Sequence, residues 1–468
     1  MQKVKSRRAA WMVSLVLLPA ILSAQVDTIK PKKYEMTVKE AVDLAFKNVI
    51  ELKNAIVDYR IQDAKNRELT GQALPQLSGS VGANYYLQLP KLLFPQSDEG
   101  VYQVLRREGL VSPTTQAPPP TLVPFSFQQP WNLTAGATLT QLLFQPDVFV
   151  GLQARKTALG YNQAVIEQTK ERIKDSAYKR YFAILIAQEQ LRFLNESLIR
   201  LRKLYHDDSI MFKNGFAEKL DLDKVQVQIN NLQTNTNAVA TGVTLAYAAL
   251  KFSLGISQRD TVVLKDELTM ETLKREVLSE GFKYEDRAEI RTLNTLQDLQ
   301  KLDVKRYKMG YLPTVALAGN YTVNGMGQKF FTDNHTTWFR SSYVGLNINL
   351  PIFTGFQRKY KVIESQLTLE KVGNNIELAK QGIDLEQKVT KEVFINALVN
   401  LDIQERNLKL AQTVYATTKT KFEQGLGSSF EVLQSDTDYQ TAQSSYFNAL
   451  YAATVAKISY LTSLGKLP

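Results

Sequence analysis

The chain has 468 residues, of which 44% are hydrophobic and 22% are charged, and this composition excludes a disordered chain. It contains no cysteine, which excludes disulfides, thiolate metal sites and a lipid-modified N-terminal cysteine. The formal net charge of +11 is spread along the chain instead of forming a stripe, so it does not indicate a nucleic-acid partner.

The first residues have the composition of an export signal. Basic residues at 3–8 precede an apolar run at 9–22, and the small residues of Leu22-Ser23-Ala24 offer a cleavage site. We therefore expect residues 1–24 to be a signal peptide. An N-terminal membrane anchor is the alternative, but the apolar run is short and is broken by Pro19. No later segment has the roughly 20 apolar residues of a spanning helix, so any membrane would be crossed by β-strands.

A helix is expected to open after this leader and to end at the first strand. Thr37 and Glu40 form a capping box, and the helix is predicted to run to Leu74, because the residue before Pro75 is pushed out of helical geometry. A downstream counterpart is expected to end in the same way at Leu312-Pro313.

After each of these prolines the apolar residues alternate with a period of two. Segments of about ten residues with one apolar face are typical of transmembrane β-strands. A half-buried strand of a soluble sandwich alternates in the same way, but flanking aromatic residues and the export signal favour the membrane. The predicted strands cover residues 77–88, 133–144, 314–324 and 343–353.

Four strands cannot close a membrane barrel, and an open edge in lipid would leave backbone groups without hydrogen-bond partners. The strands are therefore expected to be pooled between chains, and three copies would supply twelve. The link at 88–132 is long and rich in proline, so we expect a large surface loop outside the pore or folded over its mouth. The link near 325–342 is shorter.

Beyond the strands the apolar period returns to that of a helix. Helices predicted at 146–214 and 356–424 would each be about 100 Å long, and return helices at 218–254 and 428–464 about 55 Å. Such helices need neighbours along their length. Their surfaces are rich in Ala, Asn, Gln, Thr and Ser, which suits helices that line hydrated space but also an ordinary solvated face.

The chain is an internal duplication. Tyr205–Gly255 aligns without a gap with Tyr415–Gly465, and each copy reads as a helix end, a glycine turn and a returning helix. The predicted units are a first repeat at 25–255, a connecting segment at 256–284 with a short strand at 261–264, and a second repeat at 285–468.

No enzyme is predicted, and no cofactor or metal. The two histidines, His206 and His335, lie in different segments without ligand partners at a suitable spacing. No nucleophile elbow, phosphate loop or dinucleotide fingerprint is present.

The order helix, proline, strand, long loop, strand, long helix, glycine turn and return helix, given twice, resembles the TolC-like outer-membrane efflux channels. The resemblance covers Tyr34 to Gly465 and is carried by the strand entries LPQLSGSVGANYY and LPTVALAGNYTV and by the turns FKNGFAEKLDLDKVQ and FEQGLGSSFEVLQSD. It implies a mainly helical fold with transmembrane strands. Three chains would form a twelve-stranded β-barrel in the outer membrane, continued by a twelve-helix periplasmic α-barrel with an equatorial belt that includes part of 256–284.

The same resemblance implies two sites at the periplasmic tip. The glycines of the tip turns must in any case turn the chain, and the resemblance adds contact with a periplasmic adaptor. A constriction formed by two acidic positions one helical turn apart falls on Glu431 and Gln434, with Asp221 and Lys224 as the first-half equivalents, so only one of each pair is acidic. Acids at a helix start also stabilise it, which is the simpler interpretation of Asp221 and Glu431. The expected adaptor-binding residues are Gly215, Phe216, Ala217, Gly425, Leu426 and Gly427.

The expected function is a passive homotrimeric exit channel of a tripartite efflux pump or a type I secretion system. Its partners would be a periplasmic adaptor, an inner-membrane transporter and outer-membrane lipid. A periplasmic coiled-coil adaptor or scaffold outside the membrane is the alternative, and the four alternating strands argue against it. A general nutrient porin would leave the helical arms unexplained. The exported substrate is not evident from the sequence.

Overall fold

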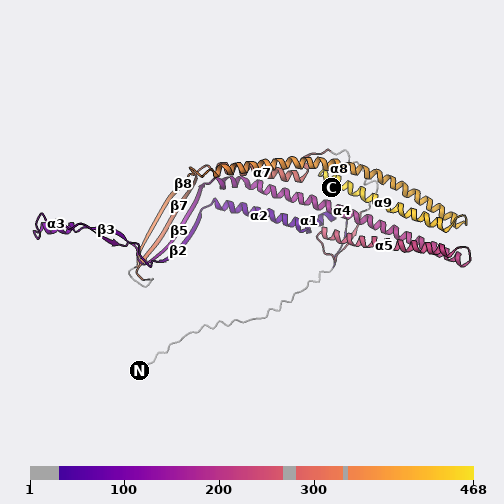
Figure 1. Cartoon of the computed structure of the whole chain (residues 1–468), viewed down its shortest axis with the longest axis horizontal. Coiled ribbons are helices and arrows are strands. Elements are labelled where there is room, and N and C mark those ends of the chain that lie inside the picture. The colour runs from indigo at the N-terminus through magenta and orange to yellow at the C-terminus, as the bar shows by residue number, and fades with distance from the viewer. Residues whose placement is uncertain (1–30, 267–280, 330–335) are drawn as a thin grey trace, which may run out of the picture.

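The computed structural model describes residues 31–266, 281–329 and 336–468 and forms an elongated, mostly helical molecule (Figure 1). A small sheet continues directly into long helices, and a thin hairpin extends from the other end of the sheet. The expected signal peptide at 1–24 lies outside the described residues, and so do residues 267–280 of the connecting segment.

One antiparallel sheet joins the two repeats in the order β2-β5-β7-β8. The central pair, β5 with β7, comes from different halves of the chain, and β2 and β8 are the free edges. The bounds are Gln76–Tyr85 for β2, Trp131–Phe144 for β5, Thr314–Gly327 for β7 and Thr337–Asn349 for β8.

The last strand differs from the predicted range 343–353. It begins earlier, at Thr337, because TWFRSS pairs with β7 although it lacks clear alternation. It ends at Asn349 because Leu350 precedes Pro351, which has no N–H for the ladder.

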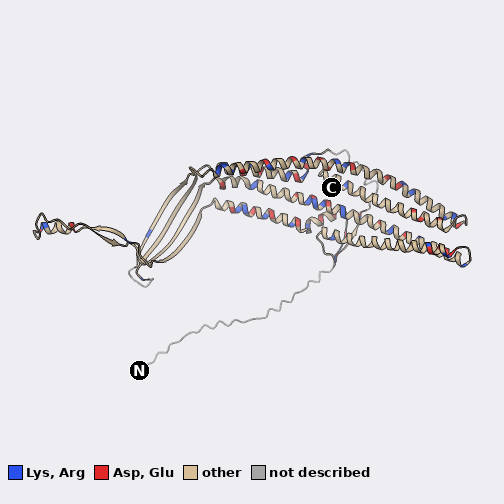
Figure 2. Ribbon diagram, in the orientation of Figure 1, with Lys and Arg blue, Asp and Glu red and all other residues tan. Residues whose placement is uncertain are grey.

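Charged residues are distributed along the helices and are nearly absent from the sheet (Figure 2). Arg340 is the one charged residue within β2, β5, β7 and β8. Many apolar side chains of these strands are exposed in the single chain, among them Val81, Val344 and Leu346. The sheet therefore has the composition of a surface that contacts something other than water.

The link at 88–132, expected to be a surface loop, contains regular structure. Strand β3 (Leu92–Gln96) pairs with β4 (Thr121–Phe125), and helix α3 (Glu99–Arg107) lies between them. Apolar residues between the prolines account for the two strands, because proline is tolerated where a strand N–H faces away from its partner.

Two long helical hairpins form the other end of the molecule. The first joins α4 (Pro146–Lys213) to α5 (Lys219–Ser253), and the second joins α8 (Gln357–Glu423) to α9 (Ser429–Ser463). The hairpins meet mainly through α4 and α9. Among the described helices, none combines enough length with enough apolar character to cross a membrane.

Shorter helices pack beside the half of α4 and α8 nearest the sheet. They are α1 (Val38–Asn48), α2 (Ile50–Gln72) and α7 (Ala288–Met309). The single helix expected from Thr37 to Leu74 is interrupted at Val49, which has an extended backbone with φ −62° and ψ 123°. The backbone of Gly255 passes so close that an added Cβ would lie 2.9 Å from the carbonyl carbon of Asn48, so tertiary packing accounts for the break.

A buried core at mid-length ties the N-terminal strand to the helices. Strand β1 (Lys33–Met36) pairs in parallel with β6 (Thr261–Leu264), the predicted short strand. The Tyr181 hydroxyl of α4 donates to the Met36 carbonyl at 2.9 Å and accepts from the backbone N–H groups of Lys265 and Asp266 at 3.2 and 3.3 Å. Burial raises the pKa of Tyr181 to about 12, so its hydroxyl stays neutral and can both donate and accept these hydrogen bonds.

Candidate functional site at the helical tip

Both helical hairpins turn on a glycine in the left-handed backbone region. Gly215 has φ 80° and Gly425 has φ 77°. The next residue closes each turn, because the Phe216 N–H donates to the Met211 carbonyl at 2.8 Å and the Leu426 N–H to the Lys421 carbonyl at 2.9 Å. The closing side chains point away from the fold, since Phe216 is 79% exposed and Leu426 76% exposed. Each turn thus presents one large apolar side chain at the end of the molecule.

The expected gate residues lie at the starts of α5 and α9. Lys224 forms an ion pair with Asp221 on its own helix at 3.5 Å, and its Nζ lies 5.2 Å from the centre of the Phe430 ring. This second contact brings the two hairpins together next to Glu431.

Glu431 and Gln434 are both exposed on α9, one helical turn apart. The Ser428 hydroxyl caps this helix by accepting from the Glu431 N–H at 3.2 Å, and Gln434 donates to Asp438 at 3.1 Å. Ser428, and not the Glu431 carboxylate, therefore caps α9, and Glu431 remains exposed to solvent at the helical tip.

A buried charged cluster, which the sequence interpretation missed, joins the hairpins above the tip. The Arg200 guanidinium of α4 donates from Nε to Asp436 Oδ1 of α9 at 3.0 Å. It also lies over the rings of Tyr415 and Tyr439, 5.4 and 5.2 Å from their centres, and these rings stack on each other with centres 5.9 Å apart. Burial raises the pKa of Asp436, and Arg200 opposes this shift.

A second buried carboxylate lies closer to the tip. Ser429, at the start of α9, donates a short hydrogen bond to Oδ2 of Asp208 on α4. Asp208 is fully buried, and its other oxygen has no hydrogen-bond partner among the described residues. Burial raises the pKa of Asp208, the Ser429 hydrogen bond lowers it, and Asp221 and Asp207 raise it further.

We predict that Asp208→Asn stabilises the helical tip at alkaline pH. A carboxylate with a raised folded-state pKa disfavours folding once it ionises, so stability contributed by Asp208 is lost as the pH rises from the ordinary aspartate range through the folded pKa. Asparagine keeps an acceptor for Ser429 without the charge. The gain is expected to be about 1 kcal/mol at pH 8 and close to zero at pH 4.

Thermal unfolding followed by circular dichroism at the two pH values measures this gain. Asp223→Asn is the matched control, because it removes an equal charge from an exposed position on α5. An equal gain at both pH values would contradict an electrostatic origin.

The buried polar residues were missed because the two repeats were compared for their similarities. At the 210-residue offset, Arg200 corresponds to Leu410, Asp436 to Gln226 and Tyr439 to Ile229. The contact between the hairpins is thus built where the copies differ. A search for mismatched polar residues on helix-core positions would have found it.

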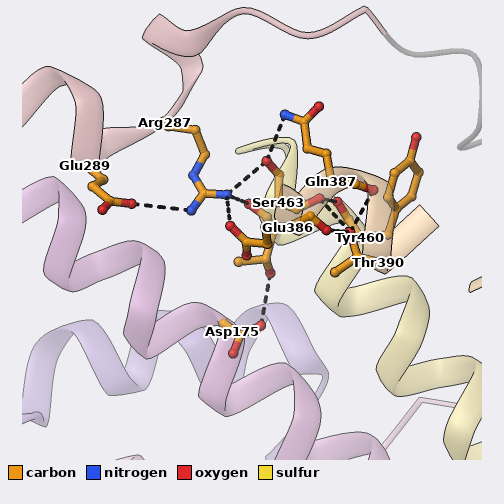
Figure 3. Close-up of polar contacts among 9 residues, drawn as sticks. Asp175, Arg287, Glu289, Glu386, Gln387, Thr390, Tyr460 and Ser463 are labelled. Atoms are coloured by element: carbon orange, nitrogen blue, oxygen red, sulfur yellow. Dashed lines mark hydrogen bonds and ion pairs between the residues drawn. The ribbon is translucent and has the colours of Figure 1, made fainter. Parts of the chain in front are cut away.

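A third polar cluster fixes the C-terminal end of α9 near the middle of the molecule (Figure 3). Arg287, which precedes α7, donates to Glu386 of α8 at 2.9 Å and to the Ser463 carbonyl at 2.9 Å. The Thr462 hydroxyl donates to Asp175 of α4 at 3.0 Å. We call this set of residues the equatorial clamp, and it secures a helix end whose carbonyls have no partner within the helix.

The described residues contain no group of three or more His, Cys, Asp or Glu placed to hold a metal ion. His206 is exposed on α4, and His335 lies outside the described residues.

Residues 296–466 match the family model described as outer membrane efflux protein. The match spans α8, the turn at Gly425 and α9, which form the second half of the tip described above. The second half of the chain is therefore similar to the outer membrane efflux proteins.

Related proteins and structures extend the similarity beyond the residues that the family model matches. The outer membrane protein TolC of Vibrio cholerae is 18% identical over 338 residues, which are 72% of this chain and 77% of TolC. The structure of CusC gives a TM-score of 0.72 at 16% identity and covers 92% of each chain. The CmeC outer membrane channel of Campylobacter jejuni gives 0.70 at 15% identity, with 92% of this chain and 85% of CmeC covered. These structures share the fold.

Proposed function

We propose that three copies of this chain form a passive exit channel that spans the outer membrane and continues as a helical tube through the periplasm. One observation carries this proposal. A four-stranded sheet with one charged residue and two free edges leads directly into four long helices. Backbone groups at a free edge find no partner in lipid, so the strands need neighbouring copies, and three copies supply twelve strands and twelve long helices.

The outer helices support the same assembly. In the single chain α8 exposes an apolar stripe, and α5 exposes a second one. The spacings within each set place its members on one helix face. Stripes of this length on both outer helices favour contact between α5 of one copy and α8 of the next. The stripe residues are Leu378, Leu385, Val389, Val393, Val399, Ile403, Leu410 and Val414 on α8, and Leu220, Val227, Leu245 and Phe252 on α5.

Within this proposal the chain is two structural repeats, 25–255 and 285–468, joined by the equatorial segment 256–284. The turns at Gly215-Phe216-Ala217 and Gly425-Leu426-Gly427 would contact a periplasmic adaptor, whose inner-membrane transporter supplies energy and selects the cargo. The exposed Phe216 and Leu426 are the apolar side chains that such a contact would cover. Either a tripartite efflux pump or a type I secretion system would fit this arrangement.

The purified protein tests the proposal directly. Light scattering in detergent is expected to give the mass of three chains, and a planar bilayer is expected to give a small, stable conductance. A monomer without conductance would contradict the shared barrel. It would favour the alternative, a periplasmic scaffold, which would also be recovered in the periplasmic wash and not in outer membranes.

We predict that Glu431→Ala reduces the preference of the channel for cations. Three copies of this exposed carboxylate around a three-fold axis would concentrate cations at the tip. The measurement is the reversal potential across a salt gradient at neutral pH. Glu423→Ala, at the end of α8, is a control of equal charge. Unchanged selectivity would leave Glu431 as a residue that only stabilises the helix start.

A further inference from the structure

The hairpin formed by β3, α3 and β4 is apolar on both faces. From the register, Leu92 and Phe94 share one face with Val123 and Phe125, and Leu93 and Pro95 share the other with Leu122 and Pro124. All of these side chains are exposed in the single chain; Leu93 is 61% exposed and Phe125 is 51% exposed. An antiparallel hairpin in water normally has one polar face. This one has none.

Such a hairpin is not stable by itself. Two isolated strands are marginal in water, and here the local support consists of a cluster of aromatic rings on one face. Phe94, Phe125 and Phe127 meet there edge to face, with centres 4.8 to 6.3 Å apart. The opposite face has no aromatic cluster of this kind among the described residues, so both faces require a cover.

The edges of the hairpin do not accept another strand. Pro124 pairs with Leu93 and Pro95 with Leu122, so both prolines occupy positions where the N–H would point away from the partner strand. Each outer edge therefore lacks a donor that strand addition would need. The prolines therefore favour a partner that packs on the faces over one that pairs with the edges.

The position of the hairpin identifies its partner. The hairpin connects the ends of β2 and β5, and β2 is a free edge of the sheet. Beyond the last β2–β5 residue pair, the Tyr86 N–H donates to the Pro130 carbonyl at 2.8 Å. Figure 1 shows the hairpin extending from the sheet end opposite the helices, and in the proposed channel this end would face the outside of the cell. It therefore begins where neighbouring copies must meet in the proposed channel.

We propose that the three hairpins pack on one another around the channel exit, the phenylalanine face of each against the proline face of the next. In a closed ring of three, every element has one neighbour on each side, so two different apolar faces are both covered. This inference rests on the proposed trimer, and it adds a collar beyond the membrane that belongs to this chain's long insert.

Cysteine cross-linking tests the collar, and the natural chain contains no cysteine to interfere. The double variant Leu93→Cys with Val123→Cys places one thiol on each face. Treatment of the detergent-solubilised protein with a short flexible bismaleimide is expected to convert most chains to covalent trimers on denaturing gels. The linker is used because direct disulfides demand strict geometry. Each single-cysteine variant is expected to remain monomeric, since like faces do not meet.

Light scattering on the same samples separates the two proposals. A particle of three chains without cross-links in the double variant would overturn the collar and leave the channel intact; the faces would then contact lipid or another protein. Cross-linked dimers from a single-cysteine variant would also overturn it, because like faces would then be in contact. A monomeric particle would remove the trimer on which the collar depends.

A deletion provides a second measurement. Replacing residues 88–129 by a tight turn keeps the pairing of β2 with β5. This variant is expected to remain a trimer but to dissociate at a lower temperature than the complete chain. An unchanged dissociation temperature would contradict packing between the hairpins.

Discussion

An Arg200→Ala variant is expected to lose about 3–5 kcal/mol of unfolding free energy, because it leaves a buried carboxylate without its cation. Asp436 is 1% exposed and Arg200 is its ion-pair partner between the two hairpins. The variant also loses the contacts of the guanidinium with Tyr415 and Tyr439. The free energy is measured by denaturant titration of the helical signal in detergent.

The loss in this variant depends on pH in a defined direction. Without Arg200 the folded-state pKa of Asp436, already raised by burial, rises further. The folded protein then holds a proton that the unfolded chain releases, so stability falls as the pH rises from the ordinary aspartate range through the folded pKa. The unfolding free energy of Arg200→Ala is therefore expected to be closer to that of the natural protein at pH 5 than at pH 8.

Two further variants isolate the buried charge. Adding Asp436→Asn to Arg200→Ala is expected to recover most of the loss, because no buried charge remains. Arg202→Ala, which removes an exposed hydrogen bond of 3.0 Å to Gln233, is expected to cost less than about 1 kcal/mol. Equal losses for Arg200→Ala and Arg202→Ala would show that the cluster contributes little.

The second large effect is expected at Gly465, beside the equatorial clamp. Its φ is 69°, and an added Cβ would lie 2.7 Å from the carbonyl oxygen of Asp286. Gly465→Ala must therefore displace the backbone of η1 (Tyr284–Asp286), which leads directly into Arg287. We expect a loss of about 3 kcal/mol or more, since an overlap with backbone adds to the cost of about 1–2 kcal/mol for a left-handed alanine.

Gly425→Ala is the matched control for this variant. Its φ of 77° is similar, but nothing lies within 4 Å of an added Cβ, so only the conformational cost applies. Thermal unfolding of the two variants measures the difference. If both variants lose the same unfolding free energy, the backbone near Asp286 moves away from the added Cβ at Gly465 without a measurable cost.

Helix ends and strand entries could be predicted because local chemistry determines them. Gly215 and Gly425 end α4 and α8, and Pro75 and Pro313 precede β2 and β7. Features that depend on distant contacts could not be predicted. Strand β1 is four residues long and requires β6 as its partner, and the break at Val49 requires the backbone of Gly255.

The candidate site was predictable only in part for a similar reason. The turns and the exposed residues Glu431 and Gln434 follow from position within each repeat. The buried pair Arg200 and Asp436 is separated by 236 residues, and its spacing carries no local signal. The proline-rich link was interpreted as a loop because proline is rare in strands, yet both strand prolines occupy the tolerated outward positions.

The difference between the two repeats has a consequence for how the proposed tube responds to temperature. Contacts within a chain contain a buried ion pair between α4 and α9 and stacked aromatic rings between α8 and α9, whereas the stripes available for contacts between chains, on α5 and α8, are apolar. Apolar association weakens on cooling, while ion pairs do not share this dependence. A ring of identical single repeats would loosen uniformly in the cold. This duplicated chain would instead come apart along the boundaries between subunits and keep each pair of hairpins together.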